Sequence, residues 1–191
     1  MSTDVAPPSI LSGPNIVLAA LVPEHAEPLR SIRRQPEVFR WWRDVEPDFP
    51  LGDDDESVRW TVLLKDTEGR LDPRPRGMIQ HLEENEPDYR HAGIDLFLDT
   101  EVAGRGVGRE VIAVLAAYLV DGRGHHRLTI DPSADNAAAI ACYTAVGFRP
   151  VGRMRAYERG NDGAWHDGLL MDALADELVR PEQLARPLTP R

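Results

Sequence analysis

The chain has 191 residues, of which 42% are hydrophobic, so its length and composition suit one domain with a substantial core. Its 32 acidic and 22 basic side chains give a net charge of -10, which argues against nucleic acid as a partner and modestly favours a cationic one, although acidic surfaces also serve solubility alone. The single cysteine, Cys142, excludes an internal disulfide, and without a long apolar run the sequence predicts a cytoplasmic protein with no signal peptide or membrane span.

The first half of the chain begins with a polar, proline-containing stretch, 1–14, that we expect to be a flexible N-terminal arm. A strand over 15–22 follows, and then a helix over 24–34 that turns Leu29 and Ile32 inward. Trp41 and Trp42 come next, in a short helix or loop. Strands over 60–65 and 77–84 are separated by a proline-rich turn and are expected to pair as a hairpin.

The second half alternates between strands and helices. The expected order is strand 93–99, helix 111–120, strand 125–131, helix 135–145 and strands 148–158 and 165–173. A single domain would then cover 15–177, and the C-terminal tail 178–191, with three prolines after 178, would be unstructured or a packing arm.

Three glycines at alternate positions, Gly104, Gly106 and Gly108, lie between strand 93–99 and helix 111–120 together with Arg105 and Arg109. Glycines permit close backbone approach, and the free amides at a helix start bind anions, so this loop predicts a phosphate site. An ordinary turn is the plain alternative, because glycine-rich loops are weak motifs by themselves.

A dinucleotide-binding module is a second alternative for the same loop. Its GxGxxG pattern needs a small residue where Arg109 or Val111 stands, so both frames fail. Asp131 lies near the position of a ribose-binding acid and keeps this alternative open.

An acid also stands in the strand ahead of the loop. Asp95 shares a face with Gly93 and Phe97, opposite Ile94 and Leu96. An unpaired carboxylate is costly to bury without a function, whereas on a solvated sheet face it would need no explanation.

The sequence around these features resembles the GNAT superfamily of acyl-CoA N-acyltransferases, and more narrowly its aminoglycoside 6'-N-acetyltransferase branch. The Q/RxxGxG/A signature maps to Ala103, Gly106 and Gly108, with alanine in place of the polar first residue, so one polar contact is in doubt. The GID triplet at 93–95, the DPS before Asn136 and the CYxxxGF ending at 142–148 resemble that branch in particular. The superfamily resemblance covers about 16–174.

The resemblance implies an α/β (α+β) fold, with a central mixed, mostly antiparallel twisted sheet of six to seven strands, flanking helices and a splayed central strand. It implies acetyl-CoA as co-substrate. The six histidines show no metal-ligand spacing, so no metal is predicted. Main-chain amides around Phe97 and Leu98 would polarise the thioester carbonyl, and Asn136 would lie beside the pantetheine arm while also capping its helix. The amides expected to grip the pyrophosphate belong to Ala103, Gly104, Arg105, Gly106, Val107, Gly108 and Arg109.

The same resemblance assigns the catalytic groups. Asp95 would bind the substrate ammonium and accept its proton, which is needed because alkylamines are almost wholly protonated at neutral pH. Tyr143 would protonate the departing thiolate; without the resemblance, it could equally be a packing aromatic of its helix. Cys142 is expected to be a small buried helix residue, because direct transfer needs no nucleophile.

The substrate side is marked by Trp41 and Trp42, which would form either an apolar wall or core packing, and by Asp131, which would be either a cleft residue or a turn residue. Other acids fit an acidic cleft or solvated loops equally well: Asp53, Asp54, Asp55, Glu56, Glu83, Glu84, Glu86 and Asp88.

We therefore predict an acetyl-CoA-dependent aminoglycoside N-acetyltransferase that acts on a cationic small-molecule amine as a monomer or homodimer, without nucleic acid or membrane partners. The alternatives are a GNAT enzyme acting on a siderophore lysine or a protein amine, a non-catalytic acyl-CoA sensor, and the dinucleotide-binding module. Asp95 counts against the siderophore enzymes, which are expected to carry a histidine on this strand.

Overall fold

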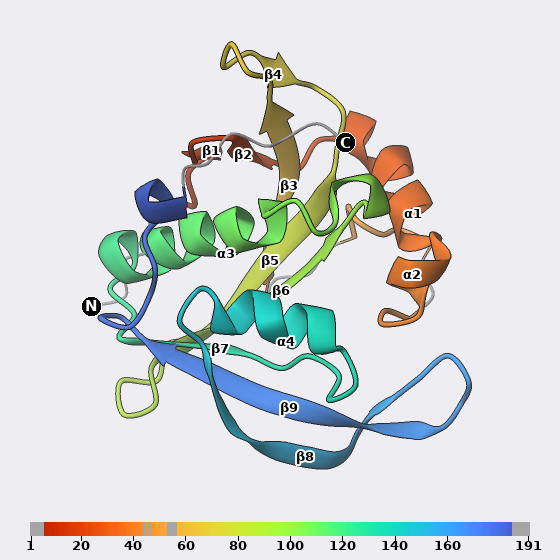
Figure 1. Ribbon diagram of the computed structural model, residues 1–191, viewed down its shortest axis with the longest axis vertical. Helices are drawn as coiled ribbons and strands as arrows, with labels where there is room; N and C mark the ends of the chain where they lie inside the picture. Colours follow the sequence, from red (N-terminus) through yellow and green to blue (C-terminus); the bar gives the residue numbers. More distant parts are fainter. Residues whose placement is uncertain (1–5, 44, 46, 53–56, 185–191) are drawn as a thin grey trace.

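The computed structural model describes residues 6–43, 45, 47–52 and 57–184, and within them the chain forms one mixed nine-stranded sheet with helices on its faces (Figure 1). The order across the sheet is β1-β2-β3-β5-β6-β7-β9-β8, with β4 paired to β3. The strands are β1 Ile10–Ser12, β2 Ile16–Ala20, β3 Ser57–Lys65, β4 Leu71–Asp72, β5 Gly77–Glu84, β6 His91–Leu98, β7 Arg127–Ile130, β8 Arg149–Arg159 and β9 Trp165–Leu174.

Four α-helices connect and cover these strands. They are α1 Ala26–Arg33, α2 Pro36–Phe39, α3 Val107–Ala117 and α4 Ala137–Thr144. Shorter helical turns are η1 Pro23–His25, η2 Thr100–Val102, η3 Tyr118–Gly122 and η4 Pro181–Leu184.

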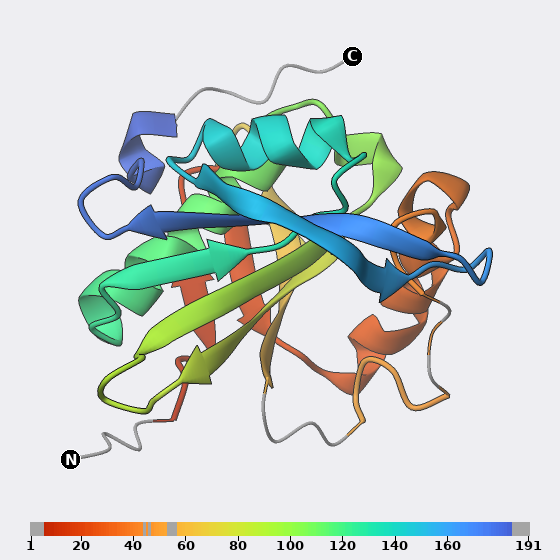
Figure 2. The ribbon, with the colours of Figure 1, turned by 90° about the horizontal axis from the view of Figure 1, so that it is seen from below.

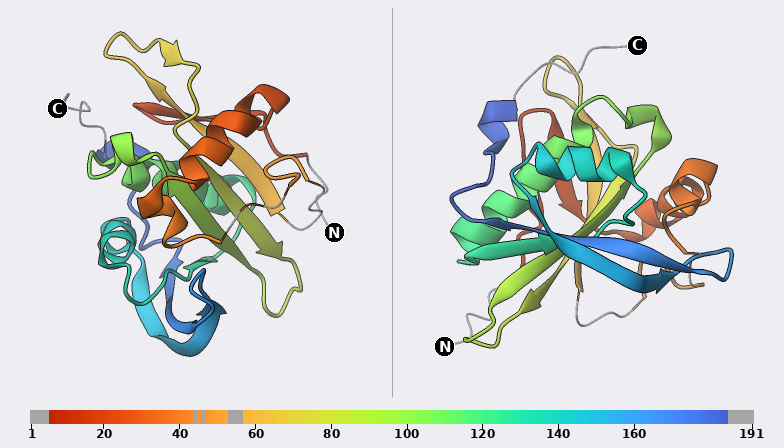
Figure 3. Two further views of the ribbon diagram at one scale, coloured as in Figure 1. Left: turned by 90° about the vertical axis from the view of Figure 1, so that its right-hand side faces the viewer. Right: turned by 60° about the horizontal axis from the view of Figure 1, so that its bottom comes forward.

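The two faces of the sheet carry separate apolar clusters. Ile79, Ile94 and Leu96 pack in the larger cluster, which contains the apolar helix α3, while Met78 and Phe97 pack against α1 and α2. Strand alternation explains this division, because successive side chains point to opposite faces. Figure 3 shows α1 and α2 on one side of the sheet and α3 on the other. The predicted face of Asp95, shared with Phe97 and opposite Ile94 and Leu96, is therefore confirmed.

The centre of the sheet is splayed, as predicted. Strands β6 and β7 form the one parallel pair among the described strands, and their register contains only Ala92 with Leu128 and Gly93 with Thr129. Beyond Gly93, β6 continues to Leu98 in full antiparallel register with β5. The edge of β6 that faces away from β5 is therefore open from Ile94 onward.

The predicted elements are confirmed with shifts of a few residues, and three expectations need correction. The segment 10–12 is not part of a loose arm, because β1 pairs with β2 there. The sheet has two further short strands, β1 and β4, beyond the six to seven predicted. Helix α3 begins at Val107, within the glycine loop, instead of at 111.

The tail packs against the domain as far as it is described. Leu178 is buried, and the amide of Val179 donates to the carbonyl of Val146. Arg180 pairs with Asp121 at 2.7 Å. Of the two expectations for this segment, a packing arm therefore holds for 178–184.

Candidate active site

A cleft of about 1140 Å³ opens where β6 and β7 diverge. Its walls come from the open edge of β6, the glycine loop, α4, the segment after α2 and the end of β8. The β8–β9 hairpin reaches across to the α2 side (Figure 2), where the side-chain amide of Asn161 donates to the carbonyls of Phe39 and Trp42 at 2.7 and 2.8 Å. Chain segments distant in sequence thus enclose one space.

The glycine loop has the backbone shape of an anion cradle. Gly104 and Gly106 adopt positive φ angles of 71° and 86°, and Gly106 is the residue from which α3 starts. A side chain at Gly108 would be tight, with a Cβ 3.3 Å from Cys142 Sγ and 3.4 Å from Leu98 Cδ1. The first-turn amides of a helix lack intrahelical acceptors and favour anions. These residues therefore fit the pyrophosphate of an acyl-CoA.

Most of the cofactor residues expected from the sequence lie at this cleft. Its lining includes Phe97, Leu98, Ala103, Gly104, Gly106, Gly108, Arg109 and Asn136. Arg105 and Val107 are not among the lining residues, and the Val107 side chain is fully buried in the core. Val107 can therefore contribute only through its backbone amide, whereas the charge expected from Arg105 and Arg109 at this mouth is supported by the lining for Arg109 alone.

Asp95 lies on the open part of β6 and lines the cleft. Burial and the nearby carboxylate of Asp131 raise the pKa of Asp95 to about 7, although Arg33 partly opposes this shift. A carboxylate with a pKa near neutrality can accept a proton without being a permanently buried charge.

Tyr143 and Asn136 come from α4, on the opposite wall. Tyr143 is buried, and desolvation together with the charge of Asp95 raises the pKa of its hydroxyl above the ordinary value. Its hydroxyl therefore stays protonated and can donate a hydrogen bond. The Asn136 side chain caps α4 by accepting from the amide of Ala139 at 3.1 Å, which confirms its capping role.

Two further acids complete the site. Asp131, which follows β7, lines the cleft and accepts a hydrogen bond from the Tyr157 hydroxyl. Glu158 on β8 also lines it, and burial followed by the charge of Asp131 keeps the pKa of Glu158 raised. Glu158 is a cleft residue that the sequence pattern did not indicate.

A bulge in β8 explains how Tyr157 and Glu158 both reach the cleft. The register with β9 shifts between Met154 and Glu158, and Ala156 within this stretch has a φ of 49°. Regular alternation would place the neighbours Tyr157 and Glu158 on opposite faces, whereas a bulge redirects a side chain. No local sequence signal marked this bulge.

Both tryptophans line the cleft and are partly buried. Trp42 packs edge-on against Phe97, with 5.3 Å between ring centroids, and the guanidinium of Arg33 lies 4.5 Å from the Trp42 ring centroid. Trp41 carries the guanidinium of Arg40 at 4.6 Å. Trp42 is therefore both a wall of the cleft and part of the smaller core cluster.

The described acids of 83–88 do not line the cleft. Glu83 lies in a separate ion-pair cluster with Arg123, His125 and His81, so its interpretation as a cleft residue is wrong. The remaining acids of that stretch, Glu84, Glu86 and Asp88, are likewise not among the lining residues, and 53–56 lie outside the described residues.

The described part of the chain contains neither a cluster of metal ligands nor a helix that could span a membrane. Among residues 6–43, 45, 47–52 and 57–184, no group of three or more His, Cys, Asp or Glu side chains could hold a metal ion. None of the helices in the same ranges is long and apolar enough to cross a membrane. Cys142 is partly buried, and desolvation raises the pKa of its thiol to about 11, which disfavours a nucleophilic thiolate.

Known proteins resemble this chain in both sequence and fold. Over 131 residues it is 28% identical to the aminoglycoside N(6')-acetyltransferase type 1 of Klebsiella pneumoniae, and the match covers 60% of this chain and 64% of the relative. The chain thus spans less than two thirds of that relative's length. The same identity and coverage hold for the enzyme of that name from Serratia marcescens.

A solved structure shares the fold at lower identity. The spermidine N-acetyltransferase from Vibrio cholerae, in complex with CoA and spermine, superposes with a TM-score of 0.70 at 20% identity, covering 85% of this chain and 96% of that one. The family model for the acetyltransferase (GNAT) family matches residues 19–148. Together with the splayed sheet and the glycine cradle, this match shows that the chain belongs to the acetyltransferase (GNAT) family.

Proposed function

We propose that the protein acetylates an amino group of an aminoglycoside, with acetyl-CoA as the acyl donor and direct attack in a ternary complex. The observation that carries the proposal is the position of Asp95, which lies in one cleft with the glycine cradle, the Tyr143 hydroxyl and two further carboxylates. The similarity to two aminoglycoside N(6')-acetyltransferases supports an aminoglycoside as the substrate.

A group of three interacting acids in the cleft favours a polycationic substrate. The carboxylates of Asp95, Asp131 and Glu158 interact closely enough that the charge of Asp131 raises the pKa of both other acids. A substrate with several ammonium groups would relieve this mutual repulsion, because an opposite charge within a few ångströms favours the ionised carboxylate. Aminoglycosides carry several ammonium groups and a sugar ring that Trp41 and Trp42 could contact.

The residues of the chain divide the work of the transfer. Acetyl-CoA supplies an activated thioester, which the amides of the 103–109 loop would anchor by its pyrophosphate. Asp95 holds the substrate ammonium and takes its proton, so that the free amine can form the new N–C bond as the C–S bond breaks. The Tyr143 hydroxyl donates to the departing sulfur and gives it a proton. The nitrogen loses its second proton as the amide forms, which replaces the proton of the Tyr143 hydroxyl through solvent, and Asp95 releases the first proton to solvent.

The test is acetyl transfer from acetyl-CoA, measured by thiol release and product mass, across aminoglycosides, spermidine and an amino-terminal peptide. We expect activity with at least one aminoglycoside and a loss of kcat/KM of at least about tenfold in Asp95→Asn. Tyr143→Phe should also be slower. Asp121→Asn, an exposed aspartate paired with Arg180, is the matched control and should retain full activity.

Two results would contradict this proposal separately. Transfer to spermidine or the peptide but to no aminoglycoside would replace the substrate and keep the chemistry. Full activity of Asp95→Asn would remove Asp95 from its role, whichever amine is used.

A further inference from the structure

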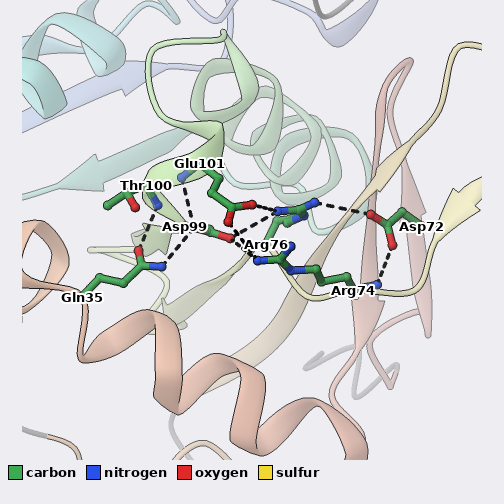
Figure 4. A network of polar contacts seen from close by, with 7 residues as sticks. All are labelled: Gln35, Asp72, Arg74, Arg76, Asp99, Thr100 and Glu101. Carbon is green, nitrogen blue, oxygen red and sulfur yellow. Dashed lines mark hydrogen bonds and ion pairs between the residues drawn. The ribbon is translucent and has the colours of Figure 1, made fainter. Parts of the chain in front are cut away.

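Gln35 bridges two segments that are far apart in sequence. It lies between α1 and α2, and its side-chain amide contacts the segment that follows β6. Its Nε2 donates to Asp99 Oδ1 at 3.0 Å, and its Oε1 accepts from the amide of Thr100, also at 3.0 Å (Figure 4). The nitrogen and the oxygen of one side-chain amide therefore each bind one of two consecutive residues.

Asp99 is itself firmly held. Only 1% of it is exposed, and Oδ1 also accepts from the amide of Glu101 at 3.0 Å. Its other oxygen lies 3.3 Å from Arg76 Nη1 and 3.6 Å from Arg74 Nη2. Displacing Asp99 alone is energetically costly, because it would leave a buried carboxylate without its hydrogen-bond and ion-pair partners.

The two segments that Gln35 joins form different walls of the cleft. Downstream of Gln35, α2 leads to Trp41 and Trp42, whose amides donate to the carbonyl of Val38 at 3.0 and 3.2 Å. Downstream of Asp99, η2 leads to the glycine loop. Lining residues come from both segments, Val38 and Trp42 from the first and Thr100 and Gly104 from the second.

Local backbone geometry makes the connection stiff. Gln35 is extended, with φ -62° and ψ 134°, and the following Pro36 fixes the first turn of α2. At the other end, the Asp99 side chain caps η2. Both ends of the Gln35 contact are therefore held by short segments with defined backbone geometry.

We propose that Gln35 and Asp99 are positioning residues that couple the acyl-CoA loop to the tryptophan wall, so that occupation of the loop by coenzyme A orders the wall before the amine binds. The inference rests on the proposed function only in that it takes this wall as the amine side. It assigns neither residue a contact with the reacting atoms.

The test is amide hydrogen exchange with and without saturating coenzyme A, which needs no amine. In the parent, coenzyme A should slow exchange in 103–109 and also, at least about fivefold, in 37–42. In Gln35→Met, which keeps the side-chain length and removes both polar contacts, protection should stay confined to 103–109. Gln183→Met is the matched control, because Gln183 also accepts from a backbone amide, that of Arg180 at 2.7 Å, far from the cleft.

A second variant keeps the test decisive if Gln35→Met folds poorly. Gln35→Glu keeps an acceptor for the amide of Thr100 but places a second carboxylate against that of Asp99. It should therefore also confine protection to the loop. Equal spread of protection in either variant and the parent, or none at 37–42 in the parent, would overturn the proposal. A failure to acetylate aminoglycosides would leave these exchange results unaffected, so the two proposals fail separately.

Discussion

Asp95 and Glu83 are acids on neighbouring strands of the same sheet, and their environments shift their pKa values in opposite directions. Glu83 accepts from Arg123 Nε at 3.0 Å and lies 2.9 Å from His125 Nε2, and these partners lower its pKa to about 2. Asp95 lies beside Asp131 and, with burial as the main cause, its pKa rises to about 7.

The comparison shows that the partners of a carboxylate decide whether burial makes it structural or reactive. Glu83 has its cations supplied by the fold, so its charge is permanent and contributes to stability. Asp95 faces acids across a cleft, and Arg33 offsets their effect only in part, so a cation from outside the chain would stabilise its charge further. The account predicts that the two sites respond oppositely to pH and to mutation.

The largest expected effect is on the pH dependence of catalysis. If deprotonated Asp95 is the base, kcat/KM should rise about tenfold per pH unit below pH 7 and level off above it, a change of about 50-fold between pH 5 and 7. A pH-rate profile with the active amine measures this. A kcat/KM that stays constant over that range would show that Asp95 is not the base.

Glu83→Gln should produce the largest loss of stability. Removing one member of this partly buried ion-pair cluster takes away the counter-charge that Glu83 supplies to Arg123, which should cost about 1.5–3 kcal/mol in the free energy of unfolding. Denaturant unfolding measures this, with Glu84→Gln on the same strand as control. A loss below about 1 kcal/mol would show that the cluster is not structural.

The histidines of the Glu83 cluster should make the fold acid-sensitive. Desolvation lowers the pKa values of His81 and His125, so their stabilising neutral forms are fully present above about 6.5 and stability is lost as pH falls below that. His125→Gln, which keeps a donor for Glu83, should therefore lose less stability than the parent between pH 7 and 5.

The acid sensitivity of His125→Gln must be compared with that of the parent, because Asp95 makes the stability of both proteins change with pH in the opposite direction. Thermal unfolding measures the difference, at about 2–4 °C per kcal/mol for a chain of this size. His166→Gln is the control, because the Asp162 side chain raises the pKa of that exposed histidine. An equal or greater acid loss in His125→Gln would contradict the assignment.

The smallest expected effect is a gain in stability at the active site. A carboxyl whose folded-state pKa is raised stabilises the fold fully only below its ordinary pKa of about 4, and this contribution is lost progressively as pH rises from there through about 7. Asp95→Asn should therefore raise the thermal midpoint at pH 8 by at least about 2–4 °C and raise it less at pH 5. A lower midpoint at pH 8 would mean that Asp95 has a stabilising partner.

Local patterns predicted what depends on local physics. Alternation placed Asp95 on the face of Phe97, and the glycine spacing located the anion cradle before α3. The sequence could not reveal that Glu158 reaches the cleft, because a bulge overrides alternation in β8. Nor could it separate Glu83 from the cleft acids, since its partners lie 40 and 42 residues away.

The most direct measurement is the titration of the two carboxyl groups by carbon-13 NMR in the absence of ligand. The account predicts a midpoint near 7 for Asp95 and about 2 for Glu83, with the Asp95 midpoint falling when a polycationic amine is bound. Midpoints for both groups near the ordinary value of about 4 would contradict the division between a reactive and a structural carboxylate.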